Sequence, residues 1–333
     1  MFETRKEDYK KYHLNMVKIG DCDPAYPALE YVANRFELNI EQRYWLAFLF
    51  ATCYCSPTVY YIYNEFPDYE NVDARRLQKW WDANKTKTVF QTDRLKVKSF
   101  NEFLPMFISY NKIVGPSQQE TFEKLLVDDP QQSYDNIYRF ANNFHYMGRF
   151  TLFIYLECMK YLTKIPIEIT NLELKEAESS RNGLCYAVAR DDLVVHKKNK
   201  RLTPEDFNVL QTHLHNLVSE LKTQNPDENI SYWSVETSLC SYKKMYWKTR
   251  YLGYYIDRLM VEILKIEKLV TEGVDWSVMW DFRKEYFPKG WLGEFNGWDG
   301  IRKQLFGTYD PALILKKKEK KKPSNFRELF NLR

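Results

Sequence analysis

The segment 38–55 reads LNIEQRYWLAFLFATCYC, and beyond its first few residues a helix drawn through it has no polar side. A helix that is apolar all round is typically buried on every face. No apolar run in the chain reaches the roughly 18 residues that a membrane-spanning helix needs. We therefore predict a buried helix here, surrounded by protein, and no membrane partner.

Local signals for helix starts recur along the chain. Ser56-Pro57 reads as an N-cap followed by proline at the first helical position, and Ser117-Gln-Gln-Glu120 reads as a capping box. Thr203-Pro-Glu-Asp206 is a further helix start. Other helices are predicted at 72–84, 100–113, 133–144, 231–249, 253–270 and 276–287.

Two segments break this helical pattern. Residues 165–170 carry the only β-like alternation, and residues 173–192 are predicted to form a polar loop with an Asn-Gly turn at 182–183. The predicted fold class is therefore all-α, with at most a short β piece.

The length of 333 residues and the shifts in composition predict four parts. These are an N-terminal extension (1–35), a helical subdomain (36–200), a second helical subdomain (201–310) and a basic tail (311–333). Residues 316–333 carry six Lys and two Arg against two Glu, which leaves the other 315 residues with a net charge of −2. Any polyanion must therefore be met by local groups and by the tail.

Several common catalytic motifs are missing. The sequence contains no G-x-x-x-x-G-K-S/T, no G-x-G-x-x-G, no H-E-x-x-H and no G-x-S-x-G, which disfavours P-loop, dinucleotide-dependent, zinc-protease and α/β-hydrolase chemistry. The six cysteines are scattered without a C-x-x-C pair, so we predict free thiols and no metal site. The 25 Tyr and 9 Trp can fill a core or stack on bases.

The first of three polar clusters surrounds Gly148, which stands directly before an apolar helix. Glycine permits a positive φ or a close approach of the backbone to a ligand. Arg149 and Glu157 are eight residues apart and lie on one side of that helix. They form either a structural ion pair at the edge of the core or part of a site that includes Asn143 and Tyr146.

The second cluster combines Arg181 and Asn182 with Asp191, and the third extends from Glu236 to Arg258. Arginine and lysine side chains in the third cluster suit phosphate or pyrophosphate, and its tyrosines suit stacking on a base. The alternative for the third cluster is a solvated amphipathic helix.

The geometry of the third cluster depends on Gly253. If a helix runs through this glycine, Arg250, Tyr254 and Arg258 share one face and Asp257 lies beside them. Lysines 243 and 244 precede this face by about two turns.

Together these clusters resemble the phage amino acid:DNA transferases, also described as α-glutamyl/putrescinyl-thymine pyrophosphorylases. This family is distantly similar to helix-hairpin-helix DNA glycosylases, so the resemblance implies a glycosylase-like helical bundle. The segments that carry it are RYWLAFLFATCY (43–54), FQTDR (90–94), YMGRFTLFIYLE (146–157), ESSRNGLC (178–185) and ETSLCSYKK…RYLGYYIDR (236–258).

The resemblance implies a reaction on double-stranded phage DNA whose 5-hydroxymethyluracil has been pyrophosphorylated by a separate kinase. An amino acid or polyamine replaces the pyrophosphate and yields a hypermodified thymine. No cofactor is certain, and Mg²⁺ is a possible companion of the pyrophosphate. The expected location is the cytoplasm of the infected bacterial host.

This chemistry assigns roles to the residues of the three clusters. The leaving pyrophosphate needs cations, the attacking ammonium needs a base, and an extruded base needs hydrogen bonds and stacking. Gly148 is the hairpin candidate at the DNA, and a lysine arm would bind DNA without reading its sequence. The candidates are Arg149, Arg181, Lys243, Lys244, Arg250 and Arg258 for pyrophosphate, Glu157, Asp191 and Asp257 as base, Asn143, Asn182, Tyr146 and Tyr254 for the extruded base, Glu236 for the donor amine, and Lys316, Lys317 and Lys318 for the arm.

The chain departs from the glycosylase pattern in its hairpin. A glycosylase hairpin has two glycines and a following catalytic aspartate, whereas only Gly148 is present here and the downstream acids are Glu168 and Glu173. Two alternatives to the transferase therefore stay open, a glycosylase-like enzyme that excises a base and a non-catalytic helical DNA-binding or scaffold protein.

Overall fold

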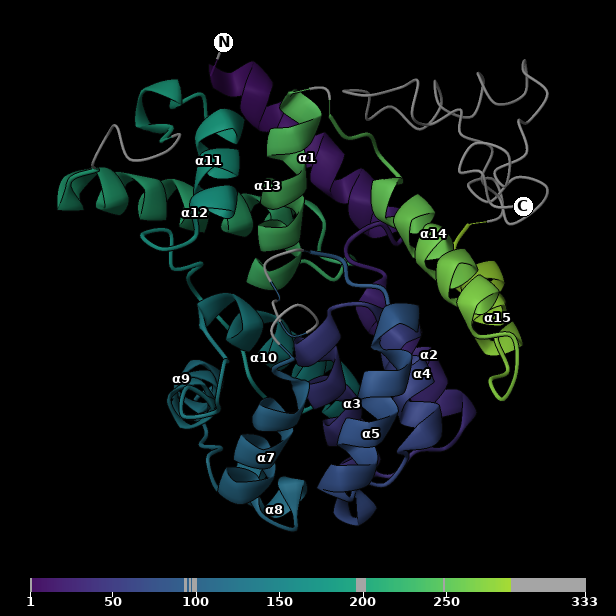
Figure 1. Ribbon diagram of the computed structural model, residues 1–333. Helices are drawn as coiled ribbons and strands as arrows, with labels where there is room; N and C mark the ends of the chain where they lie inside the picture. The colour runs from purple at the N-terminus through teal and green to yellow at the C-terminus, as the bar shows by residue number, and fades with distance from the viewer. Residues whose placement is uncertain are drawn as a thin grey trace, which may run out of the picture. The chain divides into compact units, whose positions relative to one another are not determined.

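A computed structural model describes residues 2–288 except 93–94, 96, 98–100, 196–201 and 248. Helices joined by loops make up this part of the chain and no β-strand occurs in it, so the predicted all-α fold class is confirmed (Figure 1). Residues 165–170 accordingly form no strand. None of the described helices is long and apolar enough to cross a membrane.

The chain divides into two compact units that interleave along the sequence. The first unit comprises Met1–Pro24, Ile169–Arg258 and Lys284–Arg333, and the second unit comprises Ala25–Glu168 and Leu259–Arg283. The division into four parts expected from composition stays a prediction.

The second unit is built around the predicted buried helix. This helix is α3 (Ile40–Cys53), and every residue from Tyr44 to Cys53 is buried. It packs against α10 (Arg149–Thr163) and against α4 (Ser56–Glu65). The prediction of a helix buried all round is therefore confirmed. Its other helices are α2 (Ala25–Arg35), η1 (Tyr69–Asn71), α5 (Ala74–Asn84), η2 (Lys85–Lys87), α7 (Phe103–Val114), α8 (Gln118–Glu123), α9 (Pro130–Ala141) and parts of α14 (Tyr254–Leu269) and α15 (Ser277–Tyr286).

The predicted helix starts in this unit are correct to within three residues. Cys55 takes the N-cap position of α4, so Ser56 is its first helical residue instead of its cap. Ser117 caps α8 by accepting from the amide of Glu120 at 3.2 Å, which is half of the predicted capping box. The Ser117 hydroxyl donates in turn to Glu41 on α3.

The first unit is a small helical bundle around α13 (Tyr232–Tyr246). This helix packs against α1 (Phe2–Lys18) and α11 (Glu178–Ala187), and α12 (Pro204–Gln224) packs against α11. A short 3₁₀ turn, η3 (Asp191–Leu193), follows α11. The predicted start of α12 is confirmed, because Thr203 and Asp206 form a full capping box.

The predicted Asn-Gly turn at 182–183 is wrong, because both residues lie inside α11 and are buried. A Cβ atom on Gly183 would lie 2.1 Å from the carbonyl oxygen of Leu239 in α13. Glycine is thus needed for a close approach between two helices, and its local turn preference is overridden by packing.

Helix α14 starts within one residue of the predicted helix 253–270, but the condition for a shared face of the third cluster is not met. The helix begins at Tyr254, and Gly253 before it has a φ of +89°, so the helix does not run through this glycine. The carboxylate of Asp21 accepts from the amides of Gly253 (2.7 Å), Tyr255 (2.8 Å) and Ile256 (3.0 Å). Arg250 therefore lies outside the helix, and Asp21 satisfies the amides at its N-terminus.

Replacing Asp21 by alanine is expected to lower the free energy of unfolding by about 2 kcal/mol, because three buried amides lose their acceptor. Chemical denaturation would measure the change. Asp21→Asn keeps an oxygen for the amides of Tyr255 and Ile256 and should lose less. Equal losses in both variants would contradict this account.

Candidate active site

The first predicted cluster lies within the second unit, at the junction of α9 and α10. The Asn143 side chain donates to the carbonyl of Phe140 at 3.0 Å, so it closes the end of α9. Tyr146 is exposed and adopts a left-handed φ of +64°. Arg149 is the first residue of α10, and Glu157 is buried two turns later.

The structure shows neither the positive φ nor the close backbone approach that we expected at Gly148. Gly148 is the N-cap of α10 with a φ of −79°, and a Cβ atom there would meet nothing within 4 Å. Any residue could adopt this backbone, so the left-handed turn in this stretch falls on Tyr146 instead of the glycine.

The second predicted cluster, in the first unit, mostly holds the chain together. Arg181 donates to the carbonyls of Leu174 and Lys175, at 2.9 and 3.0 Å. The Asn182 side chain donates to the carbonyl of Val195 at 2.9 Å and accepts from its amide. These bonds fix the segments before and after α11.

Asp191 forms a two-bond ion pair with Arg5, with both N–O distances at 2.7 Å. Asp191 is largely exposed, and its hydrogen bonds raise the pKa of Arg5. Because Asp191 is paired with Arg5 at the surface, it is the least suitable of the three candidates for the general base.

The third predicted cluster converges at the C-terminal end of α13, also within the first unit. Lys243 is buried and its ammonium donates to the hydroxyl of Ser179 at 3.0 Å. One turn earlier, the Cys240 thiol donates to Glu236 at 3.1 Å. We call the four basic residues Lys243, Lys244, Arg250 and Arg258 the cation cluster.

Lys244 is strongly affected by its neighbours in the cation cluster. Burial lowers its pKa to about 8, and the positive charges of Arg250, Lys243 and Arg258 contribute to the same shift. A lysine is depressed in this way when desolvation and like charges disfavour its ammonium form. Arg250, Lys243 and Arg258 therefore lie close enough to Lys244 to disfavour its charged form.

Arg250 is buried against tyrosine rings. Its guanidinium carbon lies 4.3 Å from the ring centroid of Tyr254 and 4.8 Å from that of Tyr255, and it donates to the Tyr255 hydroxyl. Arg250 and Tyr254 meet even though no helix joins them. The face predicted from a continuous helix is wrong, but the contact it implied is present.

No carboxylate among the described residues pairs with Lys244 or Arg250. Buried cations are normally neutralised, so Arg250 and the desolvated Lys244, which have no carboxylate partner in the described part of the chain, favour an anionic ligand. Arginine and lysine together suit phosphate or pyrophosphate oxygens. The arrangement therefore forms a candidate anion site in the first unit.

Asp257 lies on the same helical turn as Tyr254 and Arg258. It is buried, and the Tyr251 hydroxyl donates to it at 2.9 Å. Of the three predicted bases, Asp257 alone shares the turn that carries part of the cation cluster. Glu157 belongs to the second unit.

Sequence reasoning missed two contributions that shape this site, namely Asp21 and the contact of Ser179 with Lys243. Asp21 binds amides more than 230 positions away, and Ser179 meets Lys243 64 positions away. No local pattern marks such distant partners. Tyr255 was visible as part of the tyrosine run, which gave no indication of which ring Arg250 would contact.

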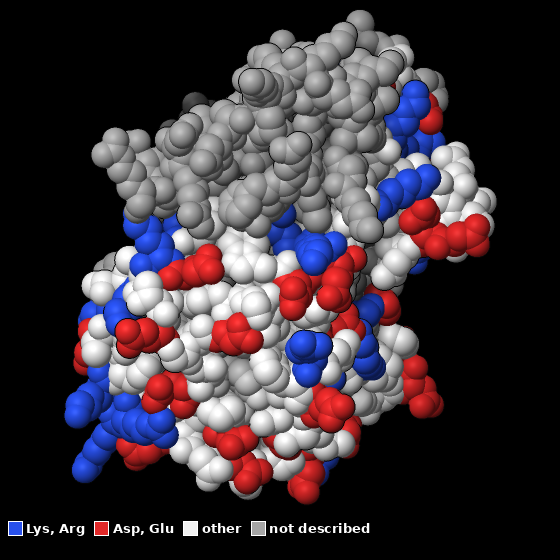
Figure 2. All heavy atoms as spheres, turned by 90° about the vertical axis from the view of Figure 1, so that its right-hand side faces the viewer, with Lys and Arg blue, Asp and Glu red and all other residues white. Residues whose placement is uncertain are grey.

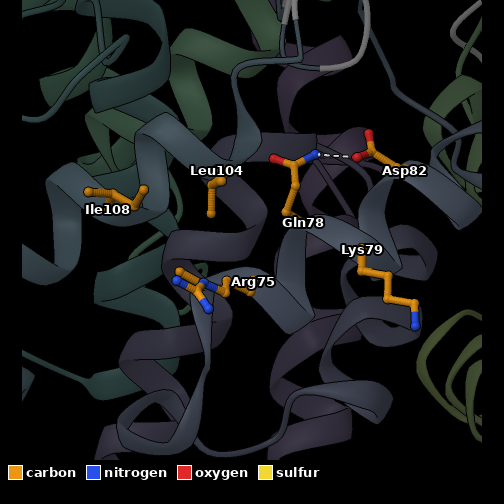
Figure 3. A pocket seen from close by; sticks show the side chains of 7 residues that line it. Arg75, Gln78, Lys79, Asp82, Leu104 and Ile108 are labelled. Atoms are coloured by element: carbon orange, nitrogen blue, oxygen red, sulfur yellow. Dashed lines mark hydrogen bonds between the residues drawn. The ribbon is translucent and has the colours of Figure 1, made fainter.

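Two other surface features lack the character of this site. On the face drawn in Figure 2, acidic and basic side chains are interspersed over the described residues. A hollow of about 620 Å³ between α5 and α7 is lined partly by Arg75, Leu104 and Ile108. Its Gln78 and Asp82 bond to each other at 2.8 Å (Figure 3), and none of the residues singled out in the sequence lines it.

Metal-binding groups are not concentrated anywhere in the described part of the chain. There, no group of three or more His, Cys, Asp or Glu side chains could hold a metal ion. The lysines at 316–318 lie outside the described residues, as do Asp93 and Arg94 of the FQTDR segment.

Comparison with known proteins adds direct information on the family. The profile of the family described as "Amino acid:DNA transferase" matches residues 17–251. The chain belongs to this family. It is also 26% identical over 305 residues to a protein of Salmonella phage ViI named "Serinyltransferase", covering 86% of this chain and 72% of that protein.

Membership of the amino acid:DNA transferase family makes this chain an enzyme of DNA modification. The matched region contains α11 and α13 and reaches Arg250, so it includes three of the four residues of the cation cluster. The non-catalytic scaffold and the base-excising glycosylase are therefore set aside.

Anion binding by this transferase should depend on pH through Lys244. Because its pKa is lowered, Lys244 loses its charge as the pH rises through about 8 instead of about 10.5. We expect the affinity for inorganic pyrophosphate to fall above pH 8 in the wild type. In Lys244→Arg, whose guanidinium stays charged, the fall should be much smaller. Calorimetric titrations from pH 7 to 9.5 would compare them, and parallel profiles would contradict the assignment.

Proposed function

We propose that this transferase replaces the pyrophosphate of 5-pyrophosphoryloxymethyluracil in phage DNA with the amine of an amino acid or polyamine. The reaction would take place in the cytoplasm of the infected host, on double-stranded DNA. The observation that carries the proposal is the cation cluster, in which Lys243 and Arg250 are buried and in which Lys244 and Arg250 have no acidic partner among the described residues.

The cation cluster suits the leaving group. As the bond between the C5 methylene and the pyrophosphate oxygen breaks, the bonding electrons leave with pyrophosphate and negative charge accumulates there. Fixed cations in a desolvated site stabilise such charge more strongly than water does. Arg250 is held by two tyrosine rings and needs little reorganisation to do so.

The donor nitrogen must lose a proton before or during its attack on the methylene carbon. A carboxylate can accept this proton. Asp257 is the base we propose, because it is buried and lies on the turn that also carries Arg258. Glu236 on α13 is the proposed partner of the donor ammonium. Mg²⁺ brought by the pyrophosphate would help to neutralise the negative charge of the leaving group.

The extruded uracil would be held by residues of the same unit. Tyr254 is proposed to stack on it, and Asn182 could bond to its edge only by exchanging its two bonds to Val195. The roles suggested for four residues of the second unit remain proposals. These are Asn143 and Tyr146 for the extruded base, Arg149 for pyrophosphate and Glu157 as a general base.

The test uses DNA containing 5-hydroxymethyluracil that the cognate kinase has pyrophosphorylated. The DNA is incubated with the protein and a mixture of amino acids and putrescine, digested to nucleosides and analysed by mass spectrometry. Serine is the first single donor to try, given the name of the phage ViI relative. A nucleoside with one amine adduct and stoichiometric pyrophosphate is expected. Intact pyrophosphorylated nucleoside after incubation with every donor would refute the proposal.

Matched variants separate the base from its neighbours. Asp257→Asn should abolish transfer while DNA binding persists. Asp191→Asn should retain transfer activity, because Asp191 is paired with Arg5 at the surface. Thermal denaturation of both variants checks that each one folds. Transfer that survives in folded Asp257→Asn would move the base elsewhere.

A further inference from the structure

Two large aromatic side chains are exposed side by side where α13 ends. Tyr246 is 43% exposed and Trp247 is 42% exposed, although most aromatic residues of the described chain are buried. We call this pair the aromatic platform. Neighbouring exposed rings of this size often mark a surface that binds something.

The aromatic platform is supported from behind by α11 and α1. The Tyr186 ring stacks on Tyr246 with centroids 4.6 Å apart and an interplanar angle of 21°, and it meets Trp247 edge-on at 6.0 Å. The guanidinium of Arg5 lies 5.6 Å from the Tyr246 centroid. These contacts restrict the rotamers of the exposed rings, so binding there would cost little conformational entropy.

Two cations contact the rings of the aromatic platform, namely Lys243 and the Arg5 that is paired with Asp191. The ammonium of Lys243 lies 5.4 Å from the Trp247 ring centroid, and Lys243 belongs to the cation cluster. The platform therefore lies between Lys244 and Arg250 in the chain, and a residue of the candidate anion site contacts one of its rings. Exposed rings interleaved with cations are the combination that binds single-stranded nucleic acid, where rings stack on bases and cations meet phosphates.

We propose that the aromatic platform stacks on an unpaired DNA base next to the reacting nucleotide, with Trp247 as the residue that contacts the base. The proposal rests on the proposed function in that DNA is the bound substrate. A base that leaves the duplex strands its neighbours, and stacking on a protein ring offsets the lost base stacking. Every base has a π face, so the platform would tolerate any neighbouring sequence.

The binding experiment is independent of amino-acid transfer. Oligonucleotides without modified uracil, each with one 2-aminopurine, are titrated with the full-length protein in the absence of donor. Stacking on Trp247 should quench the 2-aminopurine in single-stranded DNA, and Trp247→Ala should remove the quenching and weaken binding about tenfold. The dependence on salt should stay the same, because the phosphate contacts are retained.

Controls separate stacking from folding and from general apolar contact. Trp247→Phe should retain most of the affinity, and Trp247→Leu, which has bulk but no π system, should bind like Trp247→Ala. Phe36→Ala removes an equally exposed ring (47%) in the second unit and should bind like the wild type. Wild-type affinity and quenching in Trp247→Leu would overturn the proposal, and so would an equal loss in Phe36→Ala.

The two proposals can fail separately. If DNA binding depends on Trp247 but no donor is transferred, the aromatic platform stands and the proposed function fails. If transfer occurs and neither binding nor quenching depends on Trp247, the platform is refuted and the proposed function stands.

Discussion

Replacing Arg250 by alanine is expected to reduce kcat/KM for amino-acid transfer by about 10²- to 10³-fold, because the departing pyrophosphate loses a fixed charge in a desolvated site. The guanidinium is buried, lies over two tyrosine rings and has no acidic partner in the described part of the chain. A steady-state assay of pyrophosphate release would measure the effect. Arg250→Lys keeps the charge but lacks the planar guanidinium, so its kcat/KM should lie between those of the wild type and Arg250→Ala.

Arg76→Ala is the matched control for this substitution. Arg76 also lies over an aromatic ring, with its guanidinium carbon 5.0 Å from the Phe66 centroid, but it is exposed and paired with Glu65. We expect less than a twofold change in transfer. If Arg250→Ala lost no more activity than Arg76→Ala while both stayed folded, the cation cluster would not be the pyrophosphate site.

Gly183→Ala is expected to produce the largest loss of stability, about 3 kcal/mol of unfolding free energy. Alanine is favoured over glycine inside a helix by about 1 kcal/mol, so local propensity alone predicts a gain. The added methyl would lie 2.1 Å from the Leu239 carbonyl oxygen, and backbone cannot move aside as a side chain can. Urea denaturation gives both the size and the sign.

The same substitution at Gly148 provides the contrast. A Cβ atom there meets open space, and the φ of −79° suits any residue. Only the weaker capping by alanine remains, so the change should stay within about 1 kcal/mol. If Gly148→Ala lowered the free energy of unfolding strongly and Gly183→Ala lowered it little, the roles assigned to both glycines would be contradicted.

The predictability of the fold follows the range of the interactions that specify each element. The capping box at Thr203 lies within four residues, and the apolar segment 38–55 has no polar side beyond its first few residues. Both helices were therefore predicted correctly from local sequence. The turn at 182–183 was predicted wrongly, and the condition that a helix runs through Gly253 is not met. Each depends on a distant partner, namely Leu239 for Gly183 and Asp21 for Gly253.

For the candidate site, residue type was more informative than spacing. The basic residues near the end of α13 were recognised because lysine and arginine next to tyrosine indicate phosphate chemistry. Their mutual approach comes from the loop that returns Arg250 to its tyrosine neighbours, which helical periodicity could not give. Trp247 escaped notice because exposure of a ring is decided by tertiary packing.

The interleaved path of the chain has a consequence for its synthesis on the ribosome. Helix α1 leaves the ribosome well before α11 and α13, against which it packs and which follow more than 150 residues later. Its tyrosines at positions 9 and 12, fully buried in the finished unit, have no partner helix until then. Residues 25–168, by contrast, emerge as one continuous stretch. Release of the nascent chain before residue 258 would therefore leave α1 exposed to chaperones and proteases, and long-range closure makes this the slow part of folding.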